Sequence, residues 1–395
     1  MADFTQADHD YMHRALELAR QGTGMTSPNP LVGAVVVKRG RIRGEGYHRQ
    51  VGLPHAEVEA LAKVRDADAA GSTLYVTLEP CIHHGRTPPC IDLIVAKKIG
   101  RVVVPHSDPN PMVAGKGFRA LRKAGIQVDV GLMEPEARRL NEAFITFHTL
   151  QRPFMIAKWA MTLDGRIAAE SGQSKWITNE KSRTYVHEVR ACVDAVMVGI
   201  GTVLQDNPML NVRLTDYNRR QPKRVIVDGH LRIPVRAKCL ELGHLGECIL
   251  ATTEAAPPDK IARLEDAGHI VLQMKGRRGL IDMKELILGL HRYEIQSVLC
   301  EGGSSMHGSL LREKLVDKVI AFVAPKLIGG DNAKRPVTGW ELPAMGKALA
   351  LEDVVIRTFD DDICVEGYVP EAYRSLKPLS VARRQSKRRA ELHDE

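Results

Sequence analysis

The stretches "LPHAEVEALAKV" (residues 53–64) and "YVTLEPCIHHGRTPPC" (residues 75–90) set the fold and the chemistry expected of this chain. A helix is predicted to begin close to His55, and the strand "STLYVTLEP" ends at Pro80, directly before Cys81. His55, Cys81 and Cys90 together offer one imidazole and two thiolates, the donor set that suits zinc. Because a structural zinc site normally closes with a fourth Cys or His, three ligands indicate a catalytic site with a position left for water.

Glu57 is the residue expected to move protons at this site. Residues two apart on an ideal helix point about 200° away from each other, so Glu57 needs the geometry of the first turn to face the same centre as His55. A carboxylate placed there accepts a proton from the water and later delivers one to a leaving amine. The pattern H-x-E with P-C-x-x-C is typical of zinc deaminases, although eight residues, instead of two, separate the cysteines here. The two histidines of that loop remain alternative ligands, and a helix-start histidine beside two ordinary thiols remains the plain alternative.

Composition places the chain among ordinary globular proteins. It has 395 residues, 44% hydrophobic and 26% charged, which is enough for two or three domains. No run of about 18 uncharged apolar residues occurs, and the start of the chain has no apolar signal core, so we expect neither membrane insertion nor export. The seven cysteines are an odd, scattered set, which favours reduced thiols in a cytoplasmic protein. Five of them are expected to be buried small residues, and only Cys81 and Cys90 have polar, turn-forming neighbours.

The formal net charge of +8 is spread unevenly along the chain. Residues 371–395 contain seven Lys or Arg and four Asp or Glu, a net +3, which leaves +5 on residues 1–370. We interpret 371–395 as a basic, flexible tail, not as a binding arm. The remaining charge suits a phosphorylated small-molecule substrate and is weak evidence for nucleic acid, because only 5% of the residues are aromatic and stacking platforms are scarce.

Strands and helices alternate through the first 150 residues. Helices are predicted over 7–21, 55–67, 92–100, 117–125 and 134–150, and strands within 28–48, 72–80, 101–109 and 126–131. This order predicts a mostly parallel, helix-covered α/β sheet. In such sheets the ligand crevice lies outside the carboxyl ends of the strands, where "LEPC" and "PHSDPNP" both fall.

A second α/β unit of about 215 residues is predicted to begin after the junction "QRP" at 151–153. Its strands are expected within 154–162, 195–201, 224–228, 247–253, 269–274, 297–303 and 318–325, with helices between several of them. The segment "GIGTV" lacks the third glycine of a dinucleotide fingerprint. Gly302 and Gly303 lie between a strand and a helix, where free N–H groups suit a phosphate, although a simple tight turn is the alternative.

Longer motifs carry a resemblance to a known family. "SPNPLVGAVVV", "GYH", "HAE", "IHHGRTPP" and "SDPNP" resemble the deaminase half of the bifunctional riboflavin-biosynthesis deaminase/reductases. "AMTLDGRIA", "SKWIT", "DAVMVGIGTVLQDNP" and "CEGGSSMHGSLL" resemble the reductase half, so the resemblance runs from about residue 7 to about residue 370. It implies a cytidine-deaminase-like three-layer α/β/α domain over 1–150 and a dihydrofolate-reductase-like α/β domain over 151–370.

The resemblance also implies the chemistry and the partners. One Zn²⁺ per chain would serve hydrolytic deamination of 2,5-diamino-6-(5-phosphoribosylamino)pyrimidin-4(3H)-one to 5-amino-6-(5-phosphoribosylamino)uracil. NADPH would then reduce the ribosyl group to a ribityl group. The substrate is a small phosphorylated pyrimidine, with no nucleic acid and no membrane as partners, and the protein is expected to be a cytoplasmic homo-oligomer.

Individual residues take roles by the same resemblance. Zinc would be held by His55, Cys81 and Cys90, with Glu57 as the catalytic acid and base. The pyrimidine pocket of the deaminase would be lined by Asn29, His48, His83, Asp108 and Asn110. The reductase substrate would meet Lys158, Ser174, Arg190, Leu210, Arg213 and Glu301. The dinucleotide would meet Ala160, Trp176, Thr202, Asp206, Gly303, Ser304, Ser305, Met306, His307, Gly308 and Ser309. Among these, the arginines suit a ribose phosphate, and Lys158 and Glu301 suit proton transfer as the ribosylamine ring opens.

Two other functions compete with this one. A nucleic-acid or nucleoside deaminase with an accessory domain is the main alternative, and a deaminase-fold scaffold that has lost its chemistry is another. The complete set of zinc ligands and Glu57 speaks against the scaffold, and the complete second α/β unit speaks against a nucleic-acid editor. Ammonia release from a free nucleotide, compared with release from an oligonucleotide, separates the two enzymes.

A first prediction concerns the basic tail. Residues 375–395 have neither a sustained apolar face nor a motif match, so a chain that ends near Ser375 should retain both activities largely intact. Steady-state assays of each half-reaction on the shortened protein check this. A folded, shortened chain that has lost either activity contradicts it.

Overall fold

A computed structural model describes residues 3–82, 89–111, 113–277 and 279–370. The chain forms two compact units, one reaching to Leu150 and one beginning at Gln151. His83, predicted to line a substrate pocket, and the predicted tail at 371–395 lie outside the described residues.

Within the described residues, the first unit contains a five-stranded mixed sheet with the strand order β2-β1-β3-β4-β5. Its helices are α1 Gln6–Arg20, α2 Ala56–Leu61, α3 Asp66–Ala69, α4 Cys90–Ala96, α5 Lys116–Lys123, α6 Glu134–Leu140 and α7 Glu142–Leu150. Its strands are β1 Gly33–Lys38, β2 Arg41–Tyr47, β3 Thr73–Val76, β4 Arg101–Val104 and β5 Gln127–Val130. Strands β3, β4 and β5 are parallel, whereas β1 is antiparallel to both β2 and β3. The prediction of a mostly parallel sheet is therefore correct only for the β3-β4-β5 half.

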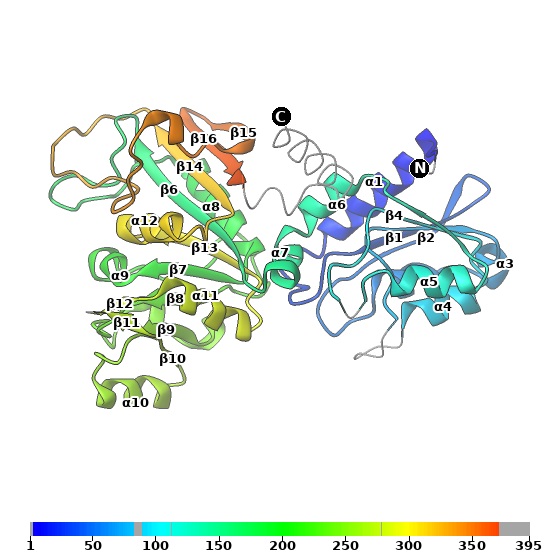
Figure 1. The fold of residues 1–395 in the computed structure, drawn as a ribbon, viewed down its shortest axis with the longest axis horizontal. Helices are drawn as coiled ribbons and strands as arrows, with labels where there is room; N and C mark the ends of the chain where they lie inside the picture. The colour runs from blue at the N-terminus through cyan, green and yellow to red at the C-terminus, as the bar shows by residue number, and fades with distance from the viewer. Residues whose placement is uncertain (1–2, 83–88, 112, 278, 371–395) are drawn as a thin grey trace, which may run out of the picture. The chain divides into compact units, whose positions relative to one another are not determined.

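Alternation along β1 explains the three layers. Val35 and Val37 join the core that α1 covers, while Ala34 and Val36 face the core that α2, α4 and α5 cover. Figure 1 shows α1 and α6 on one face of this sheet and α4 and α5 on the other. Since β3 and β4 are parallel, the segments that follow them leave the same edge of the sheet, which confirms the placement of "LEPC" and "PHSDPNP".

The helix predicted over 134–150 is broken in two at Asn141. The backbone leaves the helical region there, with φ −110° and ψ 28°. The buried Asn141 side chain accepts the N–H of Leu31 at 2.8 Å and donates to the carbonyl of Leu31 at 2.9 Å. A contact 110 residues away in sequence accompanies the break, and the local pattern carries no sign of it.

The second unit has a nine-stranded sheet within the described residues, in the order β10-β9-β8-β7-β13-β6-β14-β16-β15. Its strands are β6 Phe154–Thr162, β7 Ala195–Gly199, β8 Lys223–Val227, β9 Cys248–Thr252, β10 Ile270–Gln273, β13 Ser297–Gly302, β14 Lys318–Ala324, β15 Glu352–Phe359 and β16 Asp362–Tyr368, with a small separate sheet of β11 Gly276–Arg277 and β12 Leu280–Ile281. Its helices are α8 Glu180–Cys192, α9 Ile200–Asp206, α10 Pro258–Asp266, α11 Met283–Arg292 and α12 Ser304–Arg312. The run from β10 to β14 is parallel, and β16 and β15 close one side as an antiparallel hairpin. All seven predicted strands are present, whereas this last hairpin was not predicted.

The two faces of this sheet serve different purposes. Met155 and Ala157 of β6 pack in a core with α11 and α12. The alternate residues Lys158 and Ala160 line a cavity on the opposite face, together with residues of α8. The predicted burial of five cysteines is correct for four of them and wrong for Cys192, which is exposed because it ends α8. No helix in the part of the chain that the structure describes has the length and apolar character needed to span a bilayer.

Candidate active sites

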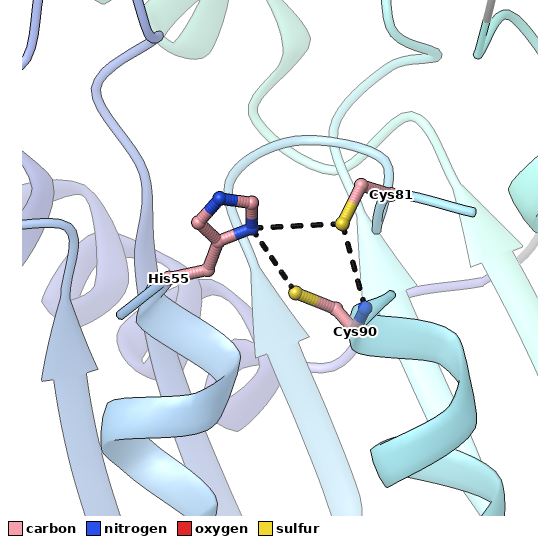
Figure 2. A group of neighbouring side chains, drawn as sticks. All are labelled: His55, Cys81 and Cys90. Carbon is pink, nitrogen blue, oxygen red and sulfur yellow. Dashed lines mark hydrogen bonds between the residues drawn. The ribbon is translucent and has the colours of Figure 1, made fainter. Parts of the chain in front are cut away.

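The three predicted zinc ligands meet at the carboxyl edge of the first sheet. His55 is the N-cap of α2, Cys81 follows β3, and Cys90 is the first residue of α4. Figure 2 shows the three side chains pointing toward one another. His55 Nδ1 lies 3.3 Å from Cys90 Sγ and 3.5 Å from Cys81 Sγ, and all three donor atoms lie within 4.8 Å of one another. One imidazole and two sulfurs at this spacing fit a tetrahedral zinc ion with a fourth, open position.

The electrostatics of the site agree with metal binding. Hydrogen bonds from Cys90 and from His55 hold the pKa of the Cys81 thiol well below its usual range, at about 4. The backbone N–H of Cys90 lies 3.4 Å from Cys81 Sγ and stabilises the thiolate directly. A thiolate, and not a thiol, is the form that binds zinc, so Cys81 favours the ligand form before any metal arrives. The hydrogen bond with Cys81, together with burial, raises the pKa of Cys90, so this second ligand loses its proton when the metal binds.

Glu57 lies beside the three ligands and is buried, with 4% of the residue exposed. His55 precedes the helix in extended conformation, with φ −71° and ψ 162°, so the opposed directions of an ideal helix do not apply to the pair. Burial, together with the nearby Cys81 sulfur, raises the pKa of Glu57 to about 7. A carboxyl group with a pKa near neutrality both accepts and returns protons efficiently at neutral pH.

A hydrogen-bonded chain fixes two predicted substrate residues next to the metal ligands. The buried His48 ring stacks edge-on against His55, with ring centroids 5.5 Å apart. His48 Nδ1 lies 3.1 Å from the carbonyl of Pro54, and Nε2 lies 3.0 Å from the Asn29 side-chain nitrogen. A carbonyl only accepts, so Nδ1 carries the proton, and Nε2 accepts from the Asn29 amide. Asn29 is thereby held in the orientation that leaves its side-chain oxygen as an acceptor for a ligand.

Asp108 and Asn110 lie on the loop that follows β4. The Asp108 carboxylate accepts the N–H of Asn110 at 2.8 Å, and burial raises the pKa of Asp108 to about 7. Cys81 is close enough to Asp108 to contribute to that increase, which places the loop at the metal site. Four of the five residues predicted to line this pocket are therefore gathered near the metal ligands, and the fifth, His83, lies outside the described residues.

A second site is a cavity of about 440 Å³ in the second unit. It is lined from β6, β7, β13, β14 and α8, and by the segment from 174 to 178. Ten of the predicted reductase residues line it: Lys158, Ala160, Ser174, Trp176, Arg190, Thr202, Asp206, Leu210, Arg213 and Glu301. The sequence motifs that carry these residues are spread over nearly 150 positions, so their convergence on one cavity is a property of the fold.

Glu301 is the centre of an ion-pair cluster in this cavity. Arg190 contacts both carboxylate oxygens of Glu301, with Nη2 3.0 Å from Oε2, and Lys158 Nζ lies 3.0 Å from the same oxygen. Burial alone would raise the pKa of Glu301, but Arg190 and Lys158 together hold that pKa well below its usual range. Glu301 therefore stays ionised and holds the Arg190 guanidinium and the Lys158 ammonium beside it.

Arg213 lacks such a partner. Its guanidinium donates to the Asn211 side chain at 2.8 Å, and within the described residues it pairs with no carboxylate. Burial and the nearby Arg190 lower the pKa of Arg213, which is the response expected of a cation next to another cation. An unpaired guanidinium in a cavity is suited to a phosphate group. Leu210, beside it, holds a left-handed backbone with φ 58°, a conformation that costs a residue with a side chain about 1–3 kcal/mol and is frequent at ligand sites.

The predicted dinucleotide residues divide into two groups. Four of them line the cavity, and Ser174 Oγ donates to Asp206 at 3.2 Å, which links a residue predicted for the substrate with one predicted for the cofactor. In the run 303–309, however, Met306 and His307 are buried in the protein. His307 lies within hydrogen-bonding distance of the carbonyls of Pro336 and Cys300, at 3.0 and 3.3 Å. The residues of this run that are not buried are Gly303, Ser304, Ser305 and Ser309, at the glycine turn and in α12, which follows β13 as predicted.

Arg183 and His187 are polar residues of the cavity that were not predicted. Arg183 lies over the Trp176 ring, 4.5 Å from its centroid, and His187 Nδ1 accepts the backbone N–H of Arg213 at 3.3 Å. With Arg190 they form a stripe at positions i, i+4 and i+7 of α8, the spacing of one helix face. That spacing in the sequence could have indicated that the three residues face one site. The three side chains are polar, however, so the pattern resembled a solvent-exposed helix face.

Matches to known families agree with both sites. Residues 5–106 match the model of the cytidine and deoxycytidylate deaminase zinc-binding region, and residues 153–365 match that of the RibD C-terminal domain. With the zinc ligands and the cationic cavity, these matches define a zinc-binding deaminase domain followed by a reductase domain.

Whole-length relatives make the assignment specific. The riboflavin biosynthesis protein RibD of Actinobacillus pleuropneumoniae is 43% identical over 365 residues, covering 92% of this chain and 96% of its own length. The structure of Acinetobacter baumannii RibD has a TM-score of 0.83 at 38% identity, covering 92% of this chain and 99% of its own. A diaminohydroxyphosphoribosylaminopyrimidine deaminase/5-amino-6-(5-phosphoribosylamino)uracil reductase from Thermotoga maritima has a TM-score of 0.80 at 39% identity, covering 91% and 98%. The chain belongs to the RibD family of riboflavin biosynthesis proteins.

Proposed function

We propose that the two sites catalyse consecutive steps on one phosphorylated pyrimidine, with His55, Cys81 and Cys90 holding zinc and Glu57 moving the protons. The substrate of the first step is 2,5-diamino-6-(5-phosphoribosylamino)pyrimidin-4(3H)-one, and the step removes its 2-amino group. The observation that carries this proposal is the buried Glu57 carboxyl beside a His–Cys–Cys set. Ammonia release from that compound by the zinc-loaded protein, and its absence with an oligonucleotide, tests the proposal against the nucleic-acid alternative.

The geometry supports a defined role for each residue in the deamination. When bound, zinc activates a water molecule as a nucleophile at neutral pH. Glu57 accepts a proton from that water and passes one to the amino group, which then leaves as ammonia. Asn29 offers its side-chain oxygen to an N–H of the pyrimidine, because His48 already accepts from its amide nitrogen.

The second cavity supports the reduction of the ribosyl group. Lys158 donates a proton to the ring oxygen as the ribosylamine opens, and Glu301 holds that ammonium in place. NADPH supplies the hydride that reduces the resulting imine carbon. Arg213 binds the phosphate, since Arg190 is already committed to Glu301. The glycine turn at 302–303 and the side chains of Trp176, Thr202 and Asp206 remain as the nucleotide contacts.

The phosphate assignment gives a second prediction. Arg213→Ala should raise the KM for the reductase substrate by about tenfold or more, because a charge-assisted hydrogen bond is lost, while the affinity for NADPH changes little. Substrate-saturation kinetics and a fluorescence titration with NADPH measure the two effects. Arg213→Lys keeps the charge but loses the fork geometry, so its KM for the reductase substrate should lie between those of the wild-type protein and Arg213→Ala. Weaker NADPH binding with an unchanged substrate KM would move Arg213 to the cofactor side.

We also propose that the protein is a homo-oligomer of the cytoplasm. Strand β15 is an edge of its sheet and exposes Val354, Val355 and Ile356, with 67% of Ile356 accessible. An exposed apolar edge strand of this kind is suited to pairing with a second copy. All seven cysteines are free, which supports a reducing compartment. Light scattering of the protein and of Ile356→Lys tests the assembly, and an unchanged molar mass for the variant contradicts this edge as the interface.

A further inference from the structure

A buried carboxylate, Glu79, lies two residues before the metal ligand Cys81 and takes no part in the chemistry described above. Only 3% of Glu79 is exposed. Its Oε2 accepts the backbone N–H of Asp108 at 3.0 Å and that of Gly115 at 2.8 Å. Its Oε1 accepts the N–H of Phe118 at 3.2 Å. Asp108 and Gly115 follow β4, and Phe118 lies in α5, so one side chain binds backbone groups on both sides of the start of this helix.

The contact is close on both sides. A Cβ added at Gly117 would lie 2.9 Å from Glu79 Oε1 and 2.6 Å from the carbonyl oxygen of Pro80. Helix α5 therefore packs directly against the end of β3, and glycine is the residue that permits it. The strand end that delivers Cys81 to the metal is in this way joined to the beginning of α5.

Stability alone is a poor reason for a buried carboxyl group in this position. A buried carboxylate loses its hydration, and an apolar side chain of similar volume usually stabilises a protein as well or better. Within the described residues, Glu79 pairs with no Lys, Arg or His, and three backbone N–H groups are what satisfy its two oxygens. Such bonds are directional, and they fix the position of the donors.

We propose that Glu79 is a positioning residue for substrate binding in the deaminase domain: it fixes the loop of Asp108 and Asn110 at a set distance from the metal ligand Cys81. The inference rests on the proposed function, in which Asp108 and Asn110 contact the pyrimidine. The N–H of Asp108 donates to Glu79, and the Asp108 carboxylate in turn accepts the N–H of Asn110. The order imposed by Glu79 thus passes to both residues of the pocket.

The test is Glu79→Gln in the zinc-loaded, full-length protein. Gln has one acceptor oxygen and presents an NH₂ group where the second oxygen accepted N–H bonds, so the loop loses part of its attachment. The KM for the deaminase substrate should rise by about tenfold or more, while kcat falls far less, zinc stays stoichiometric and the reductase activity is unchanged. Gly117→Ala, which pushes α5 away from the same carboxylate, should produce the same pattern. An unchanged KM in both variants, or loss of zinc with loss of kcat, overturns the proposal.

Two comparisons separate positioning from general support of the fold. Tyr75→Phe removes a buried 2.7 Å hydrogen bond to Asp8 from the same strand, β3, and should lower the melting temperature without changing the KM. Asn110→Ala should by itself raise the KM for the deaminase substrate. If it does not, the proposed pocket is wrong. A raised KM in Asn110→Ala together with a normal KM in Glu79→Gln refutes only the role of Glu79. Amide hydrogen exchange in the wild-type protein gives a readout without any variant. The amides of Asp108 and Gly115 should exchange slowly despite lying outside a helix or strand, and fast exchange at both contradicts the proposal.

Discussion

Glu57→Gln should abolish most of the deamination while leaving the reduction of the deaminated intermediate at close to its normal rate. Gln keeps the size of Glu but cannot accept and return a proton. Losing a positioned acid or base typically lowers kcat by about 10²–10⁴-fold. The deaminase kcat should fall by about 10⁴-fold or more, because one carboxyl group serves both the water and the leaving amine. Zinc should remain bound, since the imidazole and both thiolates are intact. Ammonia release, metal content and NADPH oxidation are the three measurements.

A matched control is available on the same helix. Glu59→Gln removes a carboxylate two residues along α2 that pairs with Arg49 at 3.5 Å, so it should leave deamination unchanged. A Glu57→Gln protein that loses its zinc would show that Glu57 is a ligand or a support of the fold. One that loses both activities would show that the two sites are not independent.

Lys158→Met should abolish most of the reduction while leaving the deamination intact, the reverse of the result expected for Glu57→Gln. The ammonium that contacts Glu301 is removed, so the ring oxygen of the ribosylamine has no positioned proton donor, and the reductase kcat should fall by about 10²–10⁴-fold. Methionine fills much of the space of the lysine chain, and Glu301 keeps its contact with Arg190, so the unit should still fold. Deamination should be normal. NADPH oxidation with the deaminated intermediate, and ammonia release with the diamino compound, measure the two effects.

Lys181→Met is the control for this variant. Lys181 lies on α8 of the same unit, is 66% exposed and pairs with Asp360 outside the cavity, so its loss should leave the reductase unchanged. If Lys158→Met reduces substrate normally, the proton comes from another group. If Lys158→Met instead loses NADPH binding, Lys158 belongs to the cofactor site.

Signals close together in sequence predicted the metal site well. His55, Cys81 and Cys90 each sit at a recognisable end of a helix or strand, and parallel strands bring such ends to one edge of the sheet. The relation of Glu57 to His55 was left open because it depends on whether His55 is inside the helix. The extended backbone of His55 as the N-cap settles that relation, and it is a matter of one residue at a helix boundary.

The features that were missed depend on distant contacts or on ambiguous local patterns. The break at Asn141 accompanies its bonds to Leu31, and the pairing of Glu301 with Lys158 joins residues 143 positions apart, as the numbering shows. Neither pairing has a local sequence signature. The hairpin of β15 and β16 did have one, since "VVIRTF" and "ICVEGY" flank an acidic turn, but the exposed apolar residues of β15 weaken its alternation. Arg183 and His187 were passed over because a polar helix face is more often turned to water.

An assay of both half-reactions in one reaction mixture tests the central claim, which is that one chain catalyses the deamination and then the reduction. The zinc-loaded protein is given the diaminopyrimidinone ribosyl phosphate and NADPH, and ammonia and NADPH are followed together. The account predicts that ammonia appears first, that NADPH oxidation follows after a lag, and that the two finish in equal amounts. NADPH oxidation by the diamino compound without ammonia release, or ammonia release that is never followed by NADPH oxidation, would contradict it.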